Sequence, residues 1–166
     1  VEERVDRAIR MTGLDRFRDD FPPALAKGDR AKVIVAAVLA MQPQIVAFDE
    51  PTTGQDYRGC HQIMEIARQL NAEGHTVIVV THDVALVAEY TKRTIALSQG
   101  EILLDDTTET VFGQPDVLRR ANVTPPQIMR LATSLPSSLG LPAKALTVEE
   151  LGEAIVERAR RPRPDG

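Results

Sequence analysis

The stretch QIVAFDEPTTGQD, from Gln44 to Asp56, decides how this chain folds. It opens with the apolar run Ile45–Phe48, which is bounded by a proline and by the acidic pair Asp49-Glu50. A short run that is apolar throughout is typical of a strand buried on both faces of a parallel sheet. We therefore expect the acidic pair at the carboxyl end of a buried strand, the edge at which open α/β sheets bind their ligands.

The two adjacent carboxylates can take different roles because successive residues of a strand point to opposite faces. Asp49 could hold a magnesium ion, which prefers oxygen ligands. Glu50 could orient or deprotonate an attacking water molecule. The same two residues could also be a structural acidic cap after a core strand. The neighbouring segments are therefore needed to distinguish a catalytic site from such a cap.

The segments that follow indicate an α/β sheet. Tyr57–Leu70 carries apolar residues at helical spacing. Thr76–Val80 is a second unalternating apolar run, so it predicts a second buried strand. The strand leads into Thr81-His82-Asp83, where Asp83 is placed to cap a helix that runs to Tyr90. Strands that alternate with helices predict a parallel sheet.

Upstream, the stretch ALAKGDRAKVIVAAVLAMQP starts as a loop that contains Gly28 and becomes an apolar helix ending before Pro43. The amino end of a helix presents unpaired N–H groups and the positive pole of the helix dipole, which favour a phosphate. Val1–Met11 has an amphipathic helical pattern. A second short helix is expected over Leu14–Phe21, closed by the two prolines that follow it.

Downstream, the two short apolar segments that flank Gln99-Gly100 predict a β-hairpin at a sheet edge. The rest of the chain is expected to be helical. The expected helices are Thr110–Arg120, one opened by Pro125-Pro126 with Thr124 as its cap, and one opened by the capping box Thr147–Glu150.

Composition limits the classes of function. A net charge of −4 gives no reason to expect nucleic acid or an anionic membrane surface as a partner. The single cysteine excludes an internal disulfide framework, and the three histidines lack zinc-site spacing. The longest apolar run, Val33–Met41, is far shorter than the roughly 20 residues needed to span a bilayer. The start Val1-Glu2-Glu3, without an initiator methionine, is expected to lie inside a longer polypeptide.

Taken in order, these segments resemble the ATP-binding-cassette (ABC) ATPases over most of the chain. Leu25–Asp29 is similar to the signature motif of that family, and Ile45–Glu50 is similar to its Walker B segment. Thr53–Asp56 resembles the D-loop, and His82 resembles the switch histidine. Within that family, the chain is most similar to the energy-coupling-factor and cobalt-type importer ATPases. Three features carry this similarity: the sequence EPTTGQD, the Lys-Gly-Asp-Arg form of the signature motif, and the C-terminal helices.

The resemblance implies part of a P-loop NTPase fold of the α/β class, with parallel core strands, an edge hairpin and a C-terminal helical extension. The implied parts are a helical subdomain with the signature motif at 1–33, a catalytic α/β core at 34–113, a helical extension that pairs ATPase subunits at 114–160, and a disordered tail at 161–166.

The resemblance also implies ATP and Mg²⁺ as ligands. Asp49 would hold the metal ion, and Glu50 and His82 would act in catalysis. The residues implied to approach the nucleotide are Ala26, Lys27, Gly28, Asp29 and Asp56. In a head-to-tail pair, the signature motif and D-loop of one ATPase subunit would close over ATP held by the second. Hydrolysis would then drive transmembrane transporter subunits from the cytoplasmic face of the cell membrane.

The sequence departs from the family in two ways. The phosphate loop G-x-x-x-x-G-K-[ST] is absent from the 166 residues and is expected before Val1, as is the Q-loop glutamine. Residues 1–166 alone are therefore expected to be inactive. Ala26 stands where the family has a serine whose hydroxyl contacts the γ-phosphate, which is expected to weaken this half of the site.

Two alternatives stay open. A soluble ABC ATPase of repair or translation would carry linker or coiled-coil insertions beside the signature motif, and none is visible in the sequence. A non-catalytic dimerisation or regulatory fragment would never meet a phosphate loop in its own chain.

Overall fold

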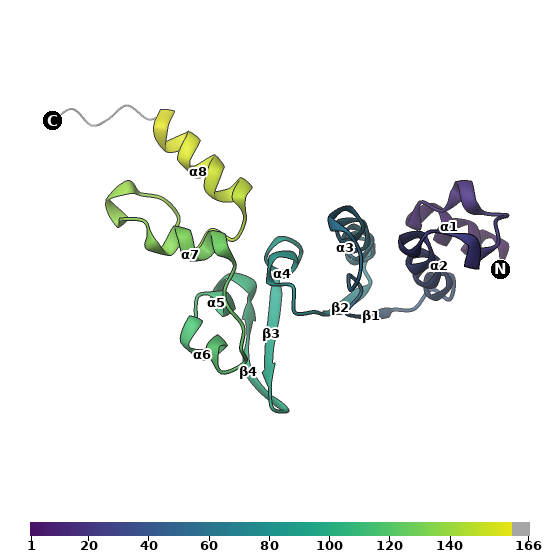
Figure 1. Cartoon of the computed structure of the whole chain (residues 1–166), viewed down its shortest axis with the longest axis horizontal. Coiled ribbons are helices and arrows are strands. Elements are labelled where there is room, and N and C mark those ends of the chain that lie inside the picture. The colour runs from purple at the N-terminus through teal and green to yellow at the C-terminus, as the bar shows by residue number, and fades with distance from the viewer. Residues whose placement is uncertain (161–166) are drawn as a thin grey trace. The chain divides into compact units, whose positions relative to one another are not determined.

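The computed structural model describes residues 1–160, which form two compact units divided between Thr81 and His82 (Figure 1). The tail at 161–166, expected to be disordered, lies outside the described residues. The first unit contains α1 (Glu2–Thr12), α2 (Lys27–Leu39), β1 (Ile45–Asp49), α3 (Tyr57–Ala72) and β2 (Thr76–Val80). The second contains α4 (Val84–Tyr90), β3 (Arg93–Ser98), β4 (Glu101–Thr107), α5 (Thr108–Phe112), α6 (Pro115–Arg119), α7 (Gln127–Ser134) and α8 (Val148–Arg160).

The segment between α1 and α2 differs from the expected helix. Within the range expected to be helical, residues 14–21, only one 3-10 turn forms, at Asp15–Phe17. The prolines begin a second turn, Pro22–Ala24, instead of closing a helix. Proline is accepted at the first turn of a helical segment, where its missing N–H would have no partner in any case. Helix α2 then begins at Lys27, so Gly28 lies in its first turn and not in a loop as expected.

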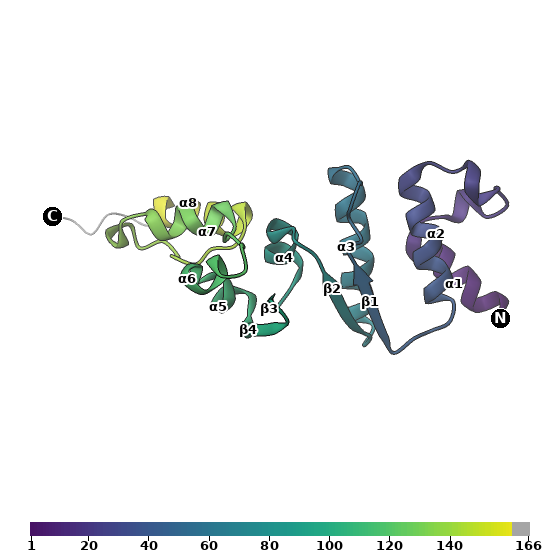
Figure 2. The same ribbon diagram turned by 60° about the horizontal axis from the view of Figure 1, so that its bottom comes forward.

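The two expected strands form and pair in parallel, in a register that sets Ile45 against Thr76 and Asp49 against Val80. Helix α3 lies along this sheet (Figure 2). The expected burial on both faces is wrong for this chain. Val46 and Phe48 are only 5% and 8% exposed, whereas Ile45 is 62% exposed. The helices of the first unit cover one face of the sheet, and no described residue of this unit covers the other.

The core of the first unit therefore lies on one side of the sheet. Val46 and Phe48 pack there with buried residues of the three helices, among them Ala36, Leu39, Ile66, Ala67 and Leu70. Val77 and Val79 of β2 face the same core, while Ile78 and Val80 are about half exposed. We call the opposite side of the sheet, formed by Ile45, Ala47, Ile78 and Val80, the outer face.

The expected hairpin forms in the second unit, as a two-stranded sheet of its own that is not hydrogen-bonded to β1 or β2. β3 and β4 pair antiparallel, with an irregular register after Ala96. Gln99 and Gly100 adopt φ values of 51° and 81°, which suit a tight turn whose twist matches that of the strands. Arg93 donates two hydrogen bonds of 2.8 Å to the Asp105 carboxylate across the hairpin. These bonds and the positive charge lower the pKa of Asp105.

The helices that follow differ in detail from those expected. The single helix over Thr110–Arg120 is wrong, because Gly113 ends α5 and Pro115 begins α6. Thr124 does not cap α7, whose first flanking residue is Pro126. The capping box of α8 does form, since Thr147 Oγ1 accepts a hydrogen bond of 3.2 Å from the Glu150 N–H.

Met129 of α7 is 2% exposed and packs in one core with residues of α4, β3, α5 and α6, so α7 is part of the second unit. Over residues 1–160, the structure contains no helix with the length and apolar character that crossing a membrane requires.

The one-sided burial of the sheet predicts effects of different size on stability for the same substitution at two neighbouring positions. Val79→Thr should lower the free energy of unfolding of this chain by about 1 kcal/mol or more, because the hydroxyl enters the apolar core. Val80→Thr makes the same chemical change on the outer face and should alter that free energy by less than about 0.5 kcal/mol. Urea unfolding of both variants measures the difference. Equal losses would mean that the outer face is covered.

Candidate functional site

The acidic pair lies where the sheet ends. Asp49 is the last residue of β1 and is exposed. The Glu50 N–H still bonds to the Val80 carbonyl at 2.8 Å, but Glu50 has a φ of 45° and the chain leaves the strand there. A residue other than glycine in this left-handed region is uncommon, and such strain is found at functional sites more often than elsewhere.

The residues after the pair fold into consecutive turns. The Thr53 N–H bonds to the Glu50 carbonyl, and the Gln55 N–H bonds to the Thr52 carbonyl, both at 3.1 Å. The Thr53 hydroxyl also lies 3.4 Å from Glu50 Oε2. Gly54 has a φ of 71°, a conformation that glycine adopts without strain. This D-loop turn, Thr53–Asp56, is therefore tied directly to the candidate catalytic carboxylate.

Asp56 has a clear structural role. Its Oδ1 accepts a hydrogen bond of 2.7 Å from the Gly59 N–H and so caps the amino end of α3. A role for Asp56 at a nucleotide stays a prediction, and it would have to coexist with this cap.

The signature segment, residues 25–29, forms the start of α2. Ala26 is the N-cap residue and offers no side-chain hydrogen bond to the first turn. The N–H groups of that turn are thus left to solvent or to an anionic ligand. Asp29 lies 3.5 Å from Lys32 Nζ, one turn further along the helix. That ion pair offsets the negative charge which Asp29 would present to a phosphate.

The structure brings the signature segment and the D-loop turn together, although they are far apart in the sequence. A Cβ atom at Gly54 would collide with Lys27 Nζ, and a Cβ atom at Gly28 would lie 3.2 Å from Gln55 Oε1. Sequence reasoning did not select Gln55 as a site residue. The signal in the sequence was the pair of glycines, Gly28 and Gly59, which leave room for its side chain.

His82 belongs to the second unit and is exposed. It directly precedes Asp83, which caps α4 as expected by accepting hydrogen bonds from Ala85 N at 3.1 Å and Leu86 N at 3.2 Å. This cap fixes the backbone next to the histidine. The action of His82 beside Glu50 stays a prediction.

Magnesium fits the residues present only in part. In the described part of the chain, no three His, Cys, Asp or Glu side chains gather into a metal-binding group. Mg²⁺ is commonly held by one or two carboxylates together with substrate phosphates and water, so the exposed Asp49 suffices if a nucleotide supplies the remaining oxygens.

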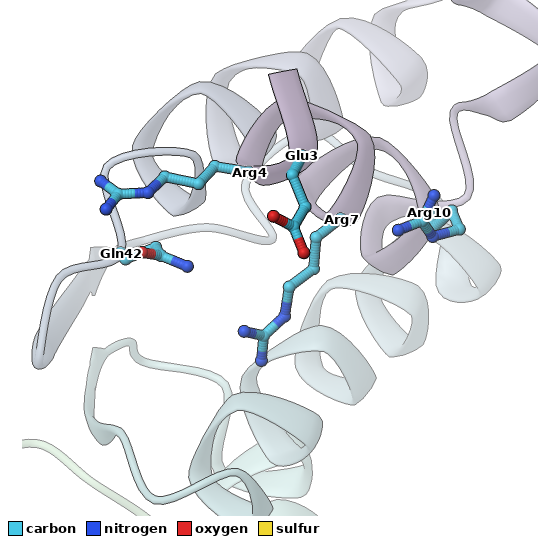
Figure 3. Close-up of a pocket in the computed structure, with 5 residues that line it drawn as sticks. All are labelled: Glu3, Arg4, Arg7, Arg10 and Gln42. Atoms are coloured by element: carbon cyan, nitrogen blue, oxygen red, sulfur yellow. The ribbon is translucent and has the colours of Figure 1, made fainter. Parts of the chain in front are cut away.

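One hollow of the first unit lies away from all these residues. It is lined by Glu3, Arg4, Arg7, Arg10 and Gln42 (Figure 3). The three arginines do not converge on one point in that view, and Arg7 is already paired with Glu73, the residue that follows α3. The hollow therefore does not form a built anion site.

No protein-family model matches the chain. The chain is 42% identical over 152 residues to a Methanosarcina mazei protein named as an ABC transporter ATP-binding protein. It is 35% identical over 157 residues to the energy-coupling factor transporter ATP-binding protein EcfA of Methanocaldococcus jannaschii. These matches cover 91% and 94% of this chain but 26% and 56% of the relatives, so the chain spans only about a quarter to a half of their length.

Solved structures agree with these relatives. The fold is similar to that of cbiO1 from Clostridium perfringens, described as part of the ABC transporter complex cbiONQ. That match has a TM-score of 0.64 and 33% identity, over 73% of this chain and 49% of cbiO1. It is also similar to the ATP-binding cassette MJ0796, solved as a dimer with ADP and Pi, with a TM-score of 0.56 and 32% identity over 64% of this chain and 46% of that one. The predicted resemblance and fold class are confirmed.

The cap at Asp56 gives a test that separates structure from chemistry. Asp56→Ala should lower the free energy of unfolding of this chain by about 0.5–2 kcal/mol, because the Gly59 N–H loses its acceptor. Asp56→Asn keeps a side-chain acceptor and should cost much less. Denaturant unfolding compares the two. If alanine and asparagine cost the same, the charge and not the cap is what stabilises α3.

Proposed function

Because this chain matches the ATP-binding-cassette ATPases in sequence and in fold, we propose that it supplies the water-activating edge of an ATP site in a transport ATPase. The observation that carries the proposal is the strand end of β1. Asp49 is exposed there, and the chain leaves the sheet at Glu50. Both the backbone carbonyl and the carboxylate of Glu50 accept hydrogen bonds from Thr53. Because the two carboxylates at this sheet edge have different surroundings, Asp49 can act as a metal ligand while Glu50 acts as a general base.

In the proposed site, Asp49 would be the protein ligand of Mg²⁺, which would supply positive charge to balance that of the ATP phosphates. Glu50 orients the attacking water and accepts its proton. The contact with Thr53 restricts the position of the Glu50 carboxylate. His82 donates a hydrogen bond to the γ-phosphate, and the fixed backbone of Asp83 next to it limits where the histidine can reach.

The start of α2 serves a second ATP molecule, bound by another ATPase subunit. Its unpaired N–H groups and the positive end of the helix dipole face the γ-phosphate of that ATP. Gly28 lets the backbone approach closely because it has no side chain, and Lys27 adds a positive charge near the D-loop turn. One chain therefore contributes to two ATP sites, and a head-to-tail dimer completes both.

A phosphate loop is needed to hold the nucleotide, and none of the 166 residues forms one. In the complete ATPase that loop is supplied from outside residues 1–166. The relatives support the further proposal that the ATPase drives transmembrane subunits of an importer from the cytoplasmic face of the membrane. One of them is named as an energy-coupling factor ATPase, and cbiO1 is described as part of a transporter complex.

The test of this function is Glu50→Gln in the complete ATPase. Glutamine keeps the shape of the side chain and cannot take a proton, so turnover should fall by about a hundredfold to ten-thousandfold. ATP binding should persist, since Glu50 is not proposed to hold the nucleotide. Single-turnover hydrolysis and equilibrium binding of labelled ATP measure the two quantities.

Asp49→Asn is the matched control one residue earlier. It should weaken Mg²⁺-dependent ATP binding, because one charged ligand is lost. A normal rate of hydrolysis by the Glu50→Gln variant would show that Glu50 is only the end of a strand.

Ala26 allows a gain-of-function test in the complete ATPase. A hydroxyl at this N-cap could donate to a γ-phosphate oxygen, and a hydrogen bond to a charged acceptor contributes about 1.5–3 kcal/mol. Ala26→Ser should therefore strengthen ATP-driven dimerisation by roughly tenfold or more. Because serine is also a better N-cap than alanine, unfolding of the nucleotide-free variant serves as the control. If serine raises stability and leaves dimerisation unchanged, position 26 does not face phosphate.

A further inference from the structure

The side chain of Gln55 lies between two glycines of different helices. Gly28 is in the first turn of α2 and Gly59 is in the first turn of α3. A Cβ atom at Gly28 would lie 3.2 Å from Gln55 Oε1, and a Cβ atom at Gly59 would lie 3.0 Å from the same oxygen. Both distances are shorter than ordinary van der Waals contact, so the amide of Gln55 fits there because both residues are glycine.

The rest of the D-loop turn agrees with this arrangement. Gln55 is half-buried, while Gly54 and Asp56 on either side of it are exposed. Its backbone is held by the 3.1 Å hydrogen bond to the Thr52 carbonyl. Lys27 of α2 lies over Gly54, so a second side chain connects the same two elements from the opposite direction. The start of α2 and the D-loop turn are thus packed against each other through Gln55 and Lys27.

We propose that Gln55 is a positioning residue that fixes the D-loop turn against the signature segment, so that the two approach the ATP of the opposite subunit as one rigid body. This inference rests on the proposed function, in which both elements serve the same opposite ATP. Gln55 itself does not touch the nucleotide. It acts by keeping the position of Gly28 fixed relative to the D-loop turn. Without this contact, the two segments would have to be ordered when the dimer closes over ATP, at a cost in conformational entropy.

The packing predicts a specific non-additivity. Gly59→Ala adds a methyl group that must push the Gln55 amide away from α2, while alanine in a helix is otherwise favourable. Gln55→Ala removes the amide altogether. In the Gln55→Ala background, the methyl group at position 59 no longer meets the amide oxygen, while Asp56 Oδ1 at 3.1 Å and the Cβ atom of residue 55 at 3.2 Å remain close to it, so Gly59→Ala should disturb the turn less than it does when Gln55 is present.

The experiment is a double-mutant cycle in the complete ATPase with Glu50→Gln present to trap the ATP-bound dimer. ATP-driven dimer formation is measured by sedimentation for Gly59→Ala, Gln55→Ala and the pair. Each single change should weaken dimer formation by about two- to tenfold, and the effect of the pair should be clearly smaller than the product of the two single effects. Strictly multiplicative effects, or no effect of Gly59→Ala, would overturn the proposal.

Gly152→Ala provides the matched control. Gly152 also lies within a helix, α8, and a Cβ atom there would meet nothing within 4 Å. It should leave dimer formation unchanged, and thermal unfolding should show that both glycine variants are folded at the temperature of the dimerisation assay. If Gly59→Ala weakened dimer formation only because it lowered the thermal stability of the folded chain, that result would contradict a positioning role for Gln55.

Failure of the proposed function would look different. In that case the Glu50→Gln parent would not accumulate an ATP-bound dimer at all. A parent that dimerises with ATP, combined with independent effects at positions 55 and 59, rejects only the role of Gln55.

Discussion

The parallel pairing of β1 with β2 is the interaction on which the first unit depends. It sets Val46 and Phe48 toward the helices and brings Asp49 opposite Val80, and its last hydrogen bond runs from the Glu50 N–H to the Val80 carbonyl. That bond decides where the strand ends and where the chain must turn. Everything proposed for catalysis begins at this point, because both carboxylates are positioned by the end of the ladder.

The left-handed backbone conformation of Glu50 is strained, and interactions in the surrounding structure have to stabilise it. A residue with a Cβ atom in the left-handed region is strained by on the order of 1–2 kcal/mol, and the turn that follows holds it there through Thr53. Gln42, Gln99 and Asn122 also adopt positive φ values, so this conformation marks the point at which the chain turns and does not by itself assign a function to the acidic pair.

Much of the fold of both units could be predicted because local chemistry determined it. The strands followed from their apolar runs, the cap of α4 from Asp83, and the hairpin from Gln99-Gly100. Burial on both faces was wrong, because an apolar run says how a strand suits a sheet and not which neighbours this chain supplies to cover it. The break between α5 and α6 was missed because helical periodicity was given more weight than Gly113 and Pro115.

The candidate site shows a similar limit. The order of the motifs along the sequence was enough to predict the candidate catalytic and binding residues, because each is a suitable residue type at the end of a predicted strand or at the start of a predicted helix. It did not give Gln55, whose role depends on a contact between α2 and the D-loop turn. Such a contact has no pattern of its own in the sequence beyond two glycines, and glycine has many other uses in turns and helices.

The D-loop turn links two roles that one chain would play in two different ATP sites. At one end, Thr53 contacts the carboxylate proposed to activate water, and at the other, Gln55 contacts the start of α2. A shift of Glu50 on hydrolysis could reach the signature segment through three consecutive residues, without any change in the core. The backbone bonds of the turn run to the carbonyls of Glu50 and Thr52, so the turn is anchored to the chain that leaves β1. Under the proposed function, the positions of Glu50 and of the signature segment are therefore linked within one chain.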